Sequence, residues 1–254
     1  MAESSTRDWD ATTYTRVALP HEDWARAILD RLDLGGGETV LDAGCGSGRT
    51  TSIVTRRVPD GRVIAVDGSP SMVAEVKKVL RPQDEALVAD LTKLELDERV
   101  DAVFSTAVFH WILDHDALFA RLRAALVDGG RLAAQCGGEG NIEAFHRAGE
   151  EVARRDPYAP YLEGIEGLLN YAGTEETEAR LRAAGFTDVR CWLEPWPVDP
   201  PEPEVFARTI CLGAQVEKLP EDLRGQFVAD VLALLDRPLR LDYVRLNIAA
   251  RAAV

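Results

Sequence analysis

The amino-acid sequence predicts an α/β fold built on a doubly wound, mostly parallel sheet. Apolar strand-like runs alternate with helical patterns over the first 136 residues, which is typical of parallel strands joined by right-handed crossovers. A glycine-rich turn follows the first of these strands, and the next two strands each end at an aspartate. The 254 residues, of which 46% are hydrophobic, are enough for one domain with a single core.

Short apolar runs bounded by turn residues predict the strands. The last run differs from the others because Val244, Leu246 and Ile248 alternate with polar residues, a pattern typical of a half-buried strand. The expected strands cover residues 39–42, 62–67, 86–89, 101–107, 131–136, 187–193 and 239–250.

Helical spacing and capping residues predict the helices between the strands. Ser69 is a good N-cap, and Pro70 after it stands where a helix tolerates proline. We expect either Asp114 or Asp116 to cap the helix that follows the fourth strand. His115 between them is then exposed at the helix start, which explains the acidic cluster without a metal. The other expected helices cover residues 21–33, 174–184 with Thr174 as the cap, and most of 204–236. A further helix is expected to start at Arg49, directly after the first strand and its glycine-rich turn.

The composition excludes several classes of partner. The formal net charge of −14 repels nucleic-acid phosphates and anionic lipids, so we expect neither as a partner. The polar N-terminus is unlike a signal peptide, and no run resembles a membrane span, so we expect a cytoplasmic protein. The cysteines lack metal-binding spacing and are expected to be reduced core thiols; they are Cys45, Cys136, Cys191 and Cys211.

Residues 40–50 form the most informative stretch and read Val-Leu-Asp-Ala-Gly-Cys-Gly-Ser-Gly-Arg-Thr. Gly44, Gly46 and Gly48 tolerate positive φ and let a ligand approach the backbone closely. At the carboxyl end of a strand in an open α/β sheet, such a turn is where nucleotide-like ligands bind. Taken alone, the turn is a weak signal, and a tight strand-to-helix connection that binds nothing is the structural alternative.

Two acidic residues strengthen the ligand interpretation. Asp67 ends the second strand, where a carboxylate can accept hydrogen bonds from both ribose hydroxyls. Asp90 ends the third strand, next to Leu91, where it can accept from an adenine amino group. A helix cap for Asp67 and a turn aspartate for Asp90 are the structural alternatives. Sites at three successive strand ends favour an adenosine-containing cofactor.

These motifs together resemble the class I S-adenosylmethionine-dependent methyltransferases. The matching segments begin with 40–48 and continue with Val-Ile-Ala-Val-Asp-Gly-Ser-Pro-Ser-Met at 63–72, Val-Ala-Asp-Leu at 88–91, 101–107 and 126–132. The resemblance implies a Rossmann-like seven-stranded sheet with an antiparallel last strand. The G-x-G-x-G spacing also differs from the dinucleotide fingerprint G-x-G-x-x-G, which favours the methyl donor over NAD.

The family resemblance implies S-adenosylmethionine as cofactor and a set of residues that bind it. It places Asp42 and Gly44 at the methionine end, Asp67 at the ribose and Asp90 at the adenine. The full expected set is Tyr14, Asp42, Gly44, Cys45, Gly46, Asp67, Gly68, Asp90, Leu91, Ser105 and Thr106.

A narrower resemblance involves the segments Trp-Asp-Ala-Thr-Thr-Tyr at 9–14 and Val-Phe-His-Trp-Ile-Leu-Asp-His at 108–115. Both are similar to the trans-aconitate methyltransferase type, in which the N-terminal segment folds over the cofactor. This implies a lid position for Tyr14, with an ordinary packed aromatic as the alternative. The resemblance ends near residue 140, so it does not extend to the acceptor.

The acceptor site is expected around His110, which follows the fourth strand and is the best candidate for a base or an orienting group. A carboxylate acceptor needs no base, whereas a phenol, alcohol or amine can need one. Trp111, His146 and Arg147 are further candidates for contact with the acceptor. Packed or surface positions are the alternative for each.

We expect one methyltransferase domain over residues 1–254. Its parts are an N-terminal helical lid (1–34), the cofactor-binding core (35–136), an insertion that caps the acceptor (137–173) and the rest of the sheet with its helices (174–254). The expected activity is methylation of a small molecule, by a monomer or homodimer without a metal. A cyclase-like reaction on the bound cofactor and a non-catalytic module are the alternatives, and a nicotinamide-dependent oxidoreductase is the least favoured.

Overall fold

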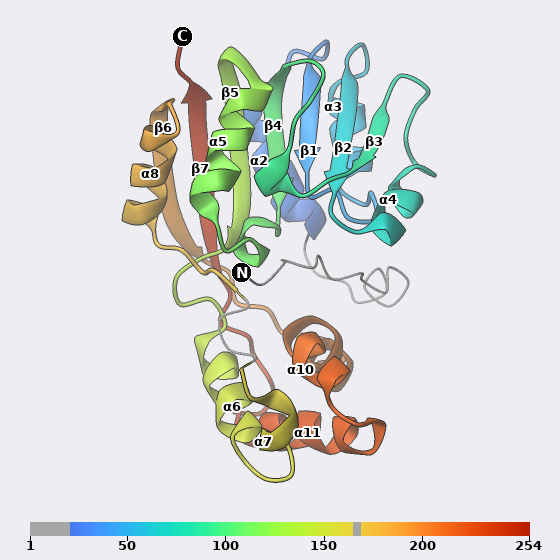
Figure 1. Ribbon diagram of the computed structural model, residues 1–254, viewed down its shortest axis with the longest axis vertical. Helices are drawn as coiled ribbons and strands as arrows, with labels where there is room; N and C mark the ends of the chain where they lie inside the picture. The colour runs from blue at the N-terminus through green and yellow to red at the C-terminus, as the bar shows by residue number, and fades with distance from the viewer. Residues whose placement is uncertain (1–20, 165–168) are drawn as a thin grey trace.

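The computed structural model of this chain describes residues 21–164 and 169–254. Its centre is a seven-stranded sheet in the order β3-β2-β1-β4-β5-β7-β6 (Figure 1). β7 pairs antiparallel with β5 and β6, whereas β1 to β5 pair parallel. This confirms the expected doubly wound sheet with its antiparallel last strand. The strands are β1 (Thr39–Ala43), β2 (Arg62–Asp67), β3 (Glu85–Val88), β4 (Val100–Thr106), β5 (Leu126–Gly137), β6 (Phe186–Pro195) and β7 (Val244–Ala252).

Two strands begin five residues away from the expected positions, whereas the others begin within one residue of theirs. β5 starts at Leu126 because a register shift after Val100 lets Leu126 pair with that residue before the ladder resumes at Arg131. The last strand starts at Val244 and not at 239. The residues before it include Leu239 and Leu241, which are buried among helices instead of in the sheet.

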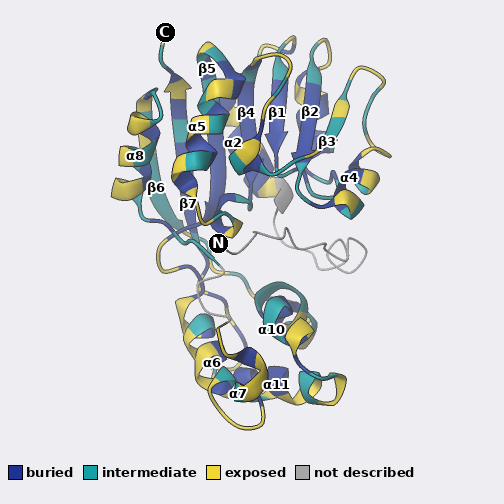
Figure 2. Ribbon diagram, in the orientation of Figure 1, coloured by how far each residue is buried: buried dark blue, intermediate teal, exposed yellow. Residues whose placement is uncertain are grey.

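Helices cover both faces of the sheet. On one face, α2 (His21–Leu32) and α3 (Thr51–Arg57) bury an apolar cluster against the central strands. On the other, α5 (His115–Ala125) and α8 (Thr174–Ala183) pack against β4, β5 and β7. Figure 2 shows the resulting buried strands between exposed helix surfaces. α4 (Pro70–Val76) follows β2, and short 3-10 turns follow β3 at Leu91–Lys93 and β4 at Phe109–Trp111.

A second apolar cluster lies beyond the carboxyl ends of the strands, among a separate group of helices (Figure 1). Residues expected as the insertion contribute α6 (Glu143–Ala153) and α7 (Ala159–Leu162), and the segment after β6 contributes the others. The helical group is therefore built from two distant parts of the chain, and not from 137–173 alone. The later members are α9 (Pro203–Phe206), the π-helical turn Ala207–Cys211, α10 (Gly213–Lys218) and α11 (Glu221–Ala233).

The expected exposure of His115 is wrong. Its side chain is only 2% exposed, and its Nε2 lies 2.9 Å from the carbonyl oxygen of Phe109, because the 3-10 turn folds back over the start of α5. Asp114 is the cap of this helix, since its carboxylate accepts from the Ala117 N–H at 2.9 Å.

Two further helix starts differ from expectation. α3 begins at Thr51 and not at Arg49, after the glycine turn is complete. α8 is capped by Gly173 and not by Thr174, because the Glu176 carboxylate accepts from the Gly173 N–H at 2.9 Å.

Candidate functional site

The glycine turn after β1 has the backbone geometry that its sequence predicts. Gly44, Gly46 and Gly48 all have positive φ, at +83°, +53° and +90°. The N–H groups of Gly44 and Cys45 both donate to the carbonyl oxygen of Val66, at 2.8 and 3.0 Å, which fixes the turn against β2. A Cβ on Gly44 would lie 2.2 Å from the Val108 side chain, whereas one on Gly46 would meet only open space. The turn therefore leaves the space beside Gly46 open.

Asp67 lies directly against this turn. Its Oδ2 accepts from the Gly46 N–H and its Oδ1 from the Ser69 N–H, both at 2.9 Å. Burial raises the pKa of Asp67, and the backbone N–H groups partly offset this rise. Ser69 caps α4 as expected, so Asp67 is not that helix's side-chain cap. Each carboxylate oxygen keeps a second lone pair that can accept a hydroxyl hydrogen.

Asp42 is fully buried beneath the turn. Its Oδ2 accepts from the Thr51 hydroxyl at 2.7 Å, and its Oδ1 has no hydrogen-bond partner among the described residues. Burial raises its pKa to about 7, against the lowering effect of Thr51. A buried carboxyl group with one unsatisfied oxygen is costly in a folded protein, so its retention here points to a ligand-binding role.

Asp90 takes part in a turn of its own. Its Oδ1 accepts from the N–H and the hydroxyl of Thr92, at 2.9 and 2.7 Å, and its Oδ2 lies 3.7 Å from Nζ of Lys93. The next residue, Leu91, is buried. The turn-aspartate alternative therefore describes Asp90 in this structure, and contact with an adenine stays a prediction.

The end of β4 contributes polar groups at the same edge of the sheet. The Ser105 hydroxyl donates to the carbonyl oxygen of Ala43 at 2.6 Å, which ties β4 to the start of the glycine turn. The buried hydroxyl of Thr106 has no partner among the described residues. Ala107 has φ +61°, a strained conformation for a residue with a Cβ. Sequence analysis missed Ala107, because an alanine carries no signal for this conformation.

His110 is 8% exposed and follows this strained residue in the 3-10 turn. Its Nδ1 accepts from the Gly137 N–H at 3.3 Å. In the neutral ring the proton is therefore on Nε2, which makes this nitrogen a donor and not a base. The ring stacks on Tyr171 with centroids 5.7 Å apart and an interplanar angle of 22°. This geometry favours the orienting role over the catalytic-base role for His110.

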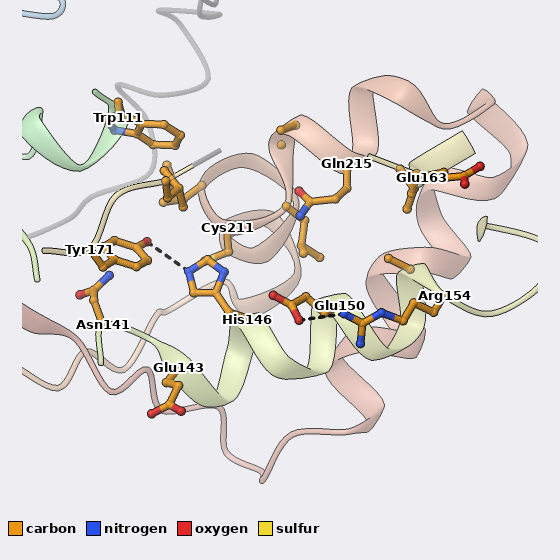
Figure 3. Close-up of a pocket in the computed structure, with 18 of the residues that line it drawn as sticks. Trp111, Asn141, Glu143, His146, Glu150, Arg154, Glu163, Tyr171, Cys211 and Gln215 are labelled. Atoms are coloured by element: carbon orange, nitrogen blue, oxygen red, sulfur yellow. Dashed lines mark hydrogen bonds and ion pairs between the residues drawn. The ribbon is translucent and has the colours of Figure 1, made fainter. Parts of the chain in front are cut away.

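A cavity of about 680 Å³ opens between Trp111, at the end of β4, and the helical group (Figure 3). His146 and Tyr171 both line it, and the Tyr171 hydroxyl lies 3.1 Å from Nε2 of His146. Burial lowers the pKa of His146. Arg147 is exposed and is not among the lining residues, so the structure does not bring it to the other acceptor candidates. The other polar residues that line the cavity are Asn141, Glu143, Glu150, Arg154, Glu163 and Gln215.

Tyr171 is the residue of this site to which sequence reasoning gave no role. It lies between His110 and His146, and it contacts both rings. The sequence offered only an aromatic residue in an insertion as a signal. Its position depends on long-range packing that no local pattern reveals. The other candidate, Tyr14, lies outside the described residues.

Some features are absent from residues 21–164 and 169–254. No group of three or more His, Cys, Asp and Glu side chains there is placed to hold a metal ion. No helix in these ranges is both long and apolar enough to cross a membrane.

Comparison with known proteins assigns this arrangement to a family. Residues 41–134 match a family model described as a methyltransferase domain. The trans-aconitate 2-methyltransferase of Variovorax paradoxus is 30% identical over 247 residues, which cover 94% of both chains. That of Methylobacterium nodulans is 34% identical over 71% of this chain and 69% of its own.

A solved structure shows the same fold. The YcgJ protein of a Bacillus species aligns with 92% of this chain and 100% of its own at a TM-score of 0.66, with 16% identity. The range matched by the family model includes the glycine turn, Asp67, Asp90 and the end of β4. The chain therefore belongs to the class I S-adenosylmethionine-dependent methyltransferases, near the trans-aconitate 2-methyltransferases, with S-adenosylmethionine as cofactor and a small molecule as methyl acceptor.

Proposed function

We propose that the crevice formed by the glycine turn, Asp67 and the end of β4 holds S-adenosylmethionine, and that the adjoining cavity holds the acceptor. The residues present fit this cofactor. Gly46 leaves open space where a side chain would fill the crevice, and the buried Asp42 Oδ1 and Thr106 hydroxyl have no partner among the described residues. Both unsatisfied groups lie at the carboxyl ends of strands, the position at which α/β sheets bind ligands.

One observation carries the proposal: Oδ2 of Asp67 lies 2.9 Å from the Gly46 nitrogen. This contact joins two motifs that are separated in sequence and makes one wall from them. The hydroxyls of a ribose placed there would donate hydrogen bonds to a carboxylate whose orientation the Gly46 and Ser69 N–H groups already fix. Preorganised acceptors of this kind bind without the cost of ordering a side chain.

The bound cofactor supplies an activated methyl group on a sulfonium, so the protein contributes alignment and exclusion of water. His110 can act as an orienting group through Tyr171, because its ring stacks on that cavity-lining residue while the Gly137 N–H fixes its Nδ1. Trp111 and Tyr171 provide aromatic walls on either side of that ring. The helical group closes the far side and limits access of water to the reacting atoms.

The experiment is calorimetric titration of the full-length protein with S-adenosylhomocysteine, comparing wild type with Asp67→Asn. Loss of a charge-assisted hydrogen bond costs about 1.5–3 kcal/mol, so we expect affinity to fall roughly 10- to 150-fold. Asp60→Asn is the matched control, because Asp60 is an exposed turn aspartate at the opposite end of β2. Equal affinity of wild type and Asp67→Asn would refute the ribose assignment.

The remaining assignments are part of the same proposal. Asp90 and Leu91 contact the adenine, Cys45 and Gly68 line the crevice, and residues 1–34 and 137–173 act as lid and acceptor cap, the latter with help from the later helices. The excess of acidic residues supports the exclusion of nucleic acid and anionic membranes as partners. Four free cysteines support a reducing compartment such as the cytoplasm. We propose a monomer or homodimer, which sedimentation analysis would decide.

A further inference from the structure

The charges around the cavity are of the wrong sign for a polyanionic acceptor. Among the described lining residues, the ionised side chains are the carboxylates of Glu143, Glu150 and Glu163 and the guanidinium of Arg154. The guanidinium of Arg154 forms an ion pair with Glu150 at 3.3 Å (Figure 3), and the Arg154 side chain is 66% exposed. The one described cation of the lining is therefore already paired with an anion.

The titratable side chains deeper in the described lining add no charge to this balance, although Arg245, which is not a lining residue, acts electrostatically on Tyr171. The pKa of His146 is lowered by burial, so its ring is neutral near pH 7, and the charges that act on it, Glu150 and Asp242, are both acidic. Tyr171 is un-ionised, because burial raises its pKa. Three carboxylates against one guanidinium leave an excess of negative charge on the described lining, so a polycarboxylate would meet a repulsive field.

Size and polarity of the lining point in the same direction. A volume of about 680 Å³ is in the range that holds drug-sized ligands. Much of the wall is apolar or aromatic, from Trp111, Leu162, Leu169, Ile210 and Leu212. A small tricarboxylate would leave much of this wall uncovered, and the described lining offers its carboxylates a single guanidinium, Arg154, which Glu150 already pairs.

We propose that this cavity takes an uncharged, largely apolar acceptor and rejects polycarboxylates, including the trans-aconitate after which the sequence relatives are named. This inference rests on the proposed function, since it assumes that the cavity is the acceptor site. Discrimination arises from repulsion by Glu143, Glu150 and Glu163 together with the apolar wall. Specificity built on a repulsive element is a common device in binding sites.

The test compares two probes with the same carbon skeleton, trans-aconitate and its uncharged trimethyl ester. Each is titrated at low salt into full-length protein saturated with S-adenosylhomocysteine. Like charges facing one another across an interface cost several kcal/mol, so we expect the ester to bind at least about tenfold more tightly. Saturation by S-adenosylhomocysteine is measured first, and its failure would count against the proposed function and not against this inference.

A charge-neutralised variant locates the source of the discrimination. Glu143→Gln/Glu150→Gln/Glu163→Gln should reduce the preference for the ester toward equal binding. The control Glu85→Gln/Glu175→Gln/Glu221→Gln removes the same number of exposed carboxylates away from the cavity and should leave the preference unchanged. Equal or tighter binding of trans-aconitate by wild type would overturn the inference. Failure of both probes to bind, or a preference for the ester that survives in the cavity variant, would overturn it as well.

Discussion

The hydroxyl of Tyr171 lies 3.1 Å from Nε2 of His146, and we assign the hydroxyl as the donor of this hydrogen bond. The direction follows from Asn141, whose Oδ1 accepts from the Val244 N–H at 3.0 Å, so that its amide nitrogen faces Tyr171. Asn141 thus donates to the phenolic oxygen, which lowers the pKa of Tyr171 against the larger effect of burial. His146 then accepts on Nε2 and carries its proton on Nδ1 when neutral.

This chain of hydrogen bonds predicts the tautomer and the titration of His146. Burial favours the neutral ring, so ¹⁵N imidazole spectra should show the Nδ1–H form and a midpoint below the ordinary pKa of 6.5. Tyr171→Phe keeps the ring beside His110 but removes the donor. It should abolish the preference for this tautomer and cost about 1–3 kcal/mol of unfolding free energy, because buried partners lose a hydrogen bond.

Two variants make that measurement interpretable. His146→Asn assigns the His146 resonances by their disappearance, and Tyr161→Phe removes a hydroxyl from an exposed tyrosine and should change neither spectrum nor stability. A wild-type His146 that titrates at or above pH 6.5, or that carries its proton on Nε2, would contradict the proposed hydrogen-bond direction.

The glycine turn predicts different outcomes at two neighbouring positions. Gly44→Ala should destabilise the fold strongly, because its Cβ would lie 2.2 Å from Val108 at a φ of +83°. Gly46→Ala meets no atom within 4 Å, so only its φ of +53° opposes it, at about 1–2 kcal/mol. Its methyl group would nevertheless enter the crevice. We therefore expect Gly46→Ala to stay folded but to bind S-adenosylhomocysteine at least about tenfold more weakly, equivalent to about 1.4 kcal/mol.

Urea denaturation and calorimetry on the same preparations separate these effects. Gly129→Ala serves as the control for backbone strain alone, because Gly129 has φ +75° and open space around its Cβ position, but lies at the opposite edge of the sheet from the crevice. Gly129→Ala should lower the free energy of unfolding and leave the affinity for S-adenosylhomocysteine unchanged. If Gly46→Ala binds S-adenosylhomocysteine as tightly as the wild type, the crevice at Gly46 is not the cofactor site.

The cofactor half of the molecule was predictable from sequence because local patterns determine it. The ends of β1 to β4, the glycine turn and the Ser69 cap each depend on residues close in sequence; the turn and the cap lie where expected and these strand ends lie within one residue of it. The antiparallel direction of β7 came from the family resemblance instead, and its position between β5 and β6 was not predicted. It depends on pairing between residues more than a hundred positions apart, such as Gln135 with Asn247.

The acceptor half was less predictable because its parts are distant in sequence. The cavity joins Trp111, His146 and Cys211, which lie on three separate segments. His115 illustrates the same difficulty, because its acidic neighbours suggested exposure while the 3-10 turn before it buries the ring. Arg147 was predicted to contact the acceptor together with its neighbour His146, but adjacent helical residues point to different faces of α6.

Asp42 predicts an unusual pH dependence of stability. Its pKa rises from 3.8 to about 7 on folding, chiefly through burial. The folded state therefore binds the proton of Asp42 more tightly than the unfolded state does. The stability that this difference gives is fully present below pH 3.8 and is lost as the pH rises through 7. A shift of about 3 units corresponds to about 4 kcal/mol. Asp42→Asn keeps an acceptor for Thr51 and carries no charge, so its advantage over wild type should grow across this window and level off above it.

Urea denaturation between about pH 4 and pH 8 measures this difference, with Asp60→Asn as an exposed control whose difference from wild type should stay flat over the upper part of the range. An advantage of Asp42→Asn that is constant, or that grows as the pH falls, would contradict the raised pKa. The same group should respond to ligand, because the cationic amino group at the methionine end of the cofactor favours the ionised carboxylate. Titration of wild type with S-adenosylhomocysteine near pH 7 should therefore release protons into the buffer, and Asp42→Asn should release fewer.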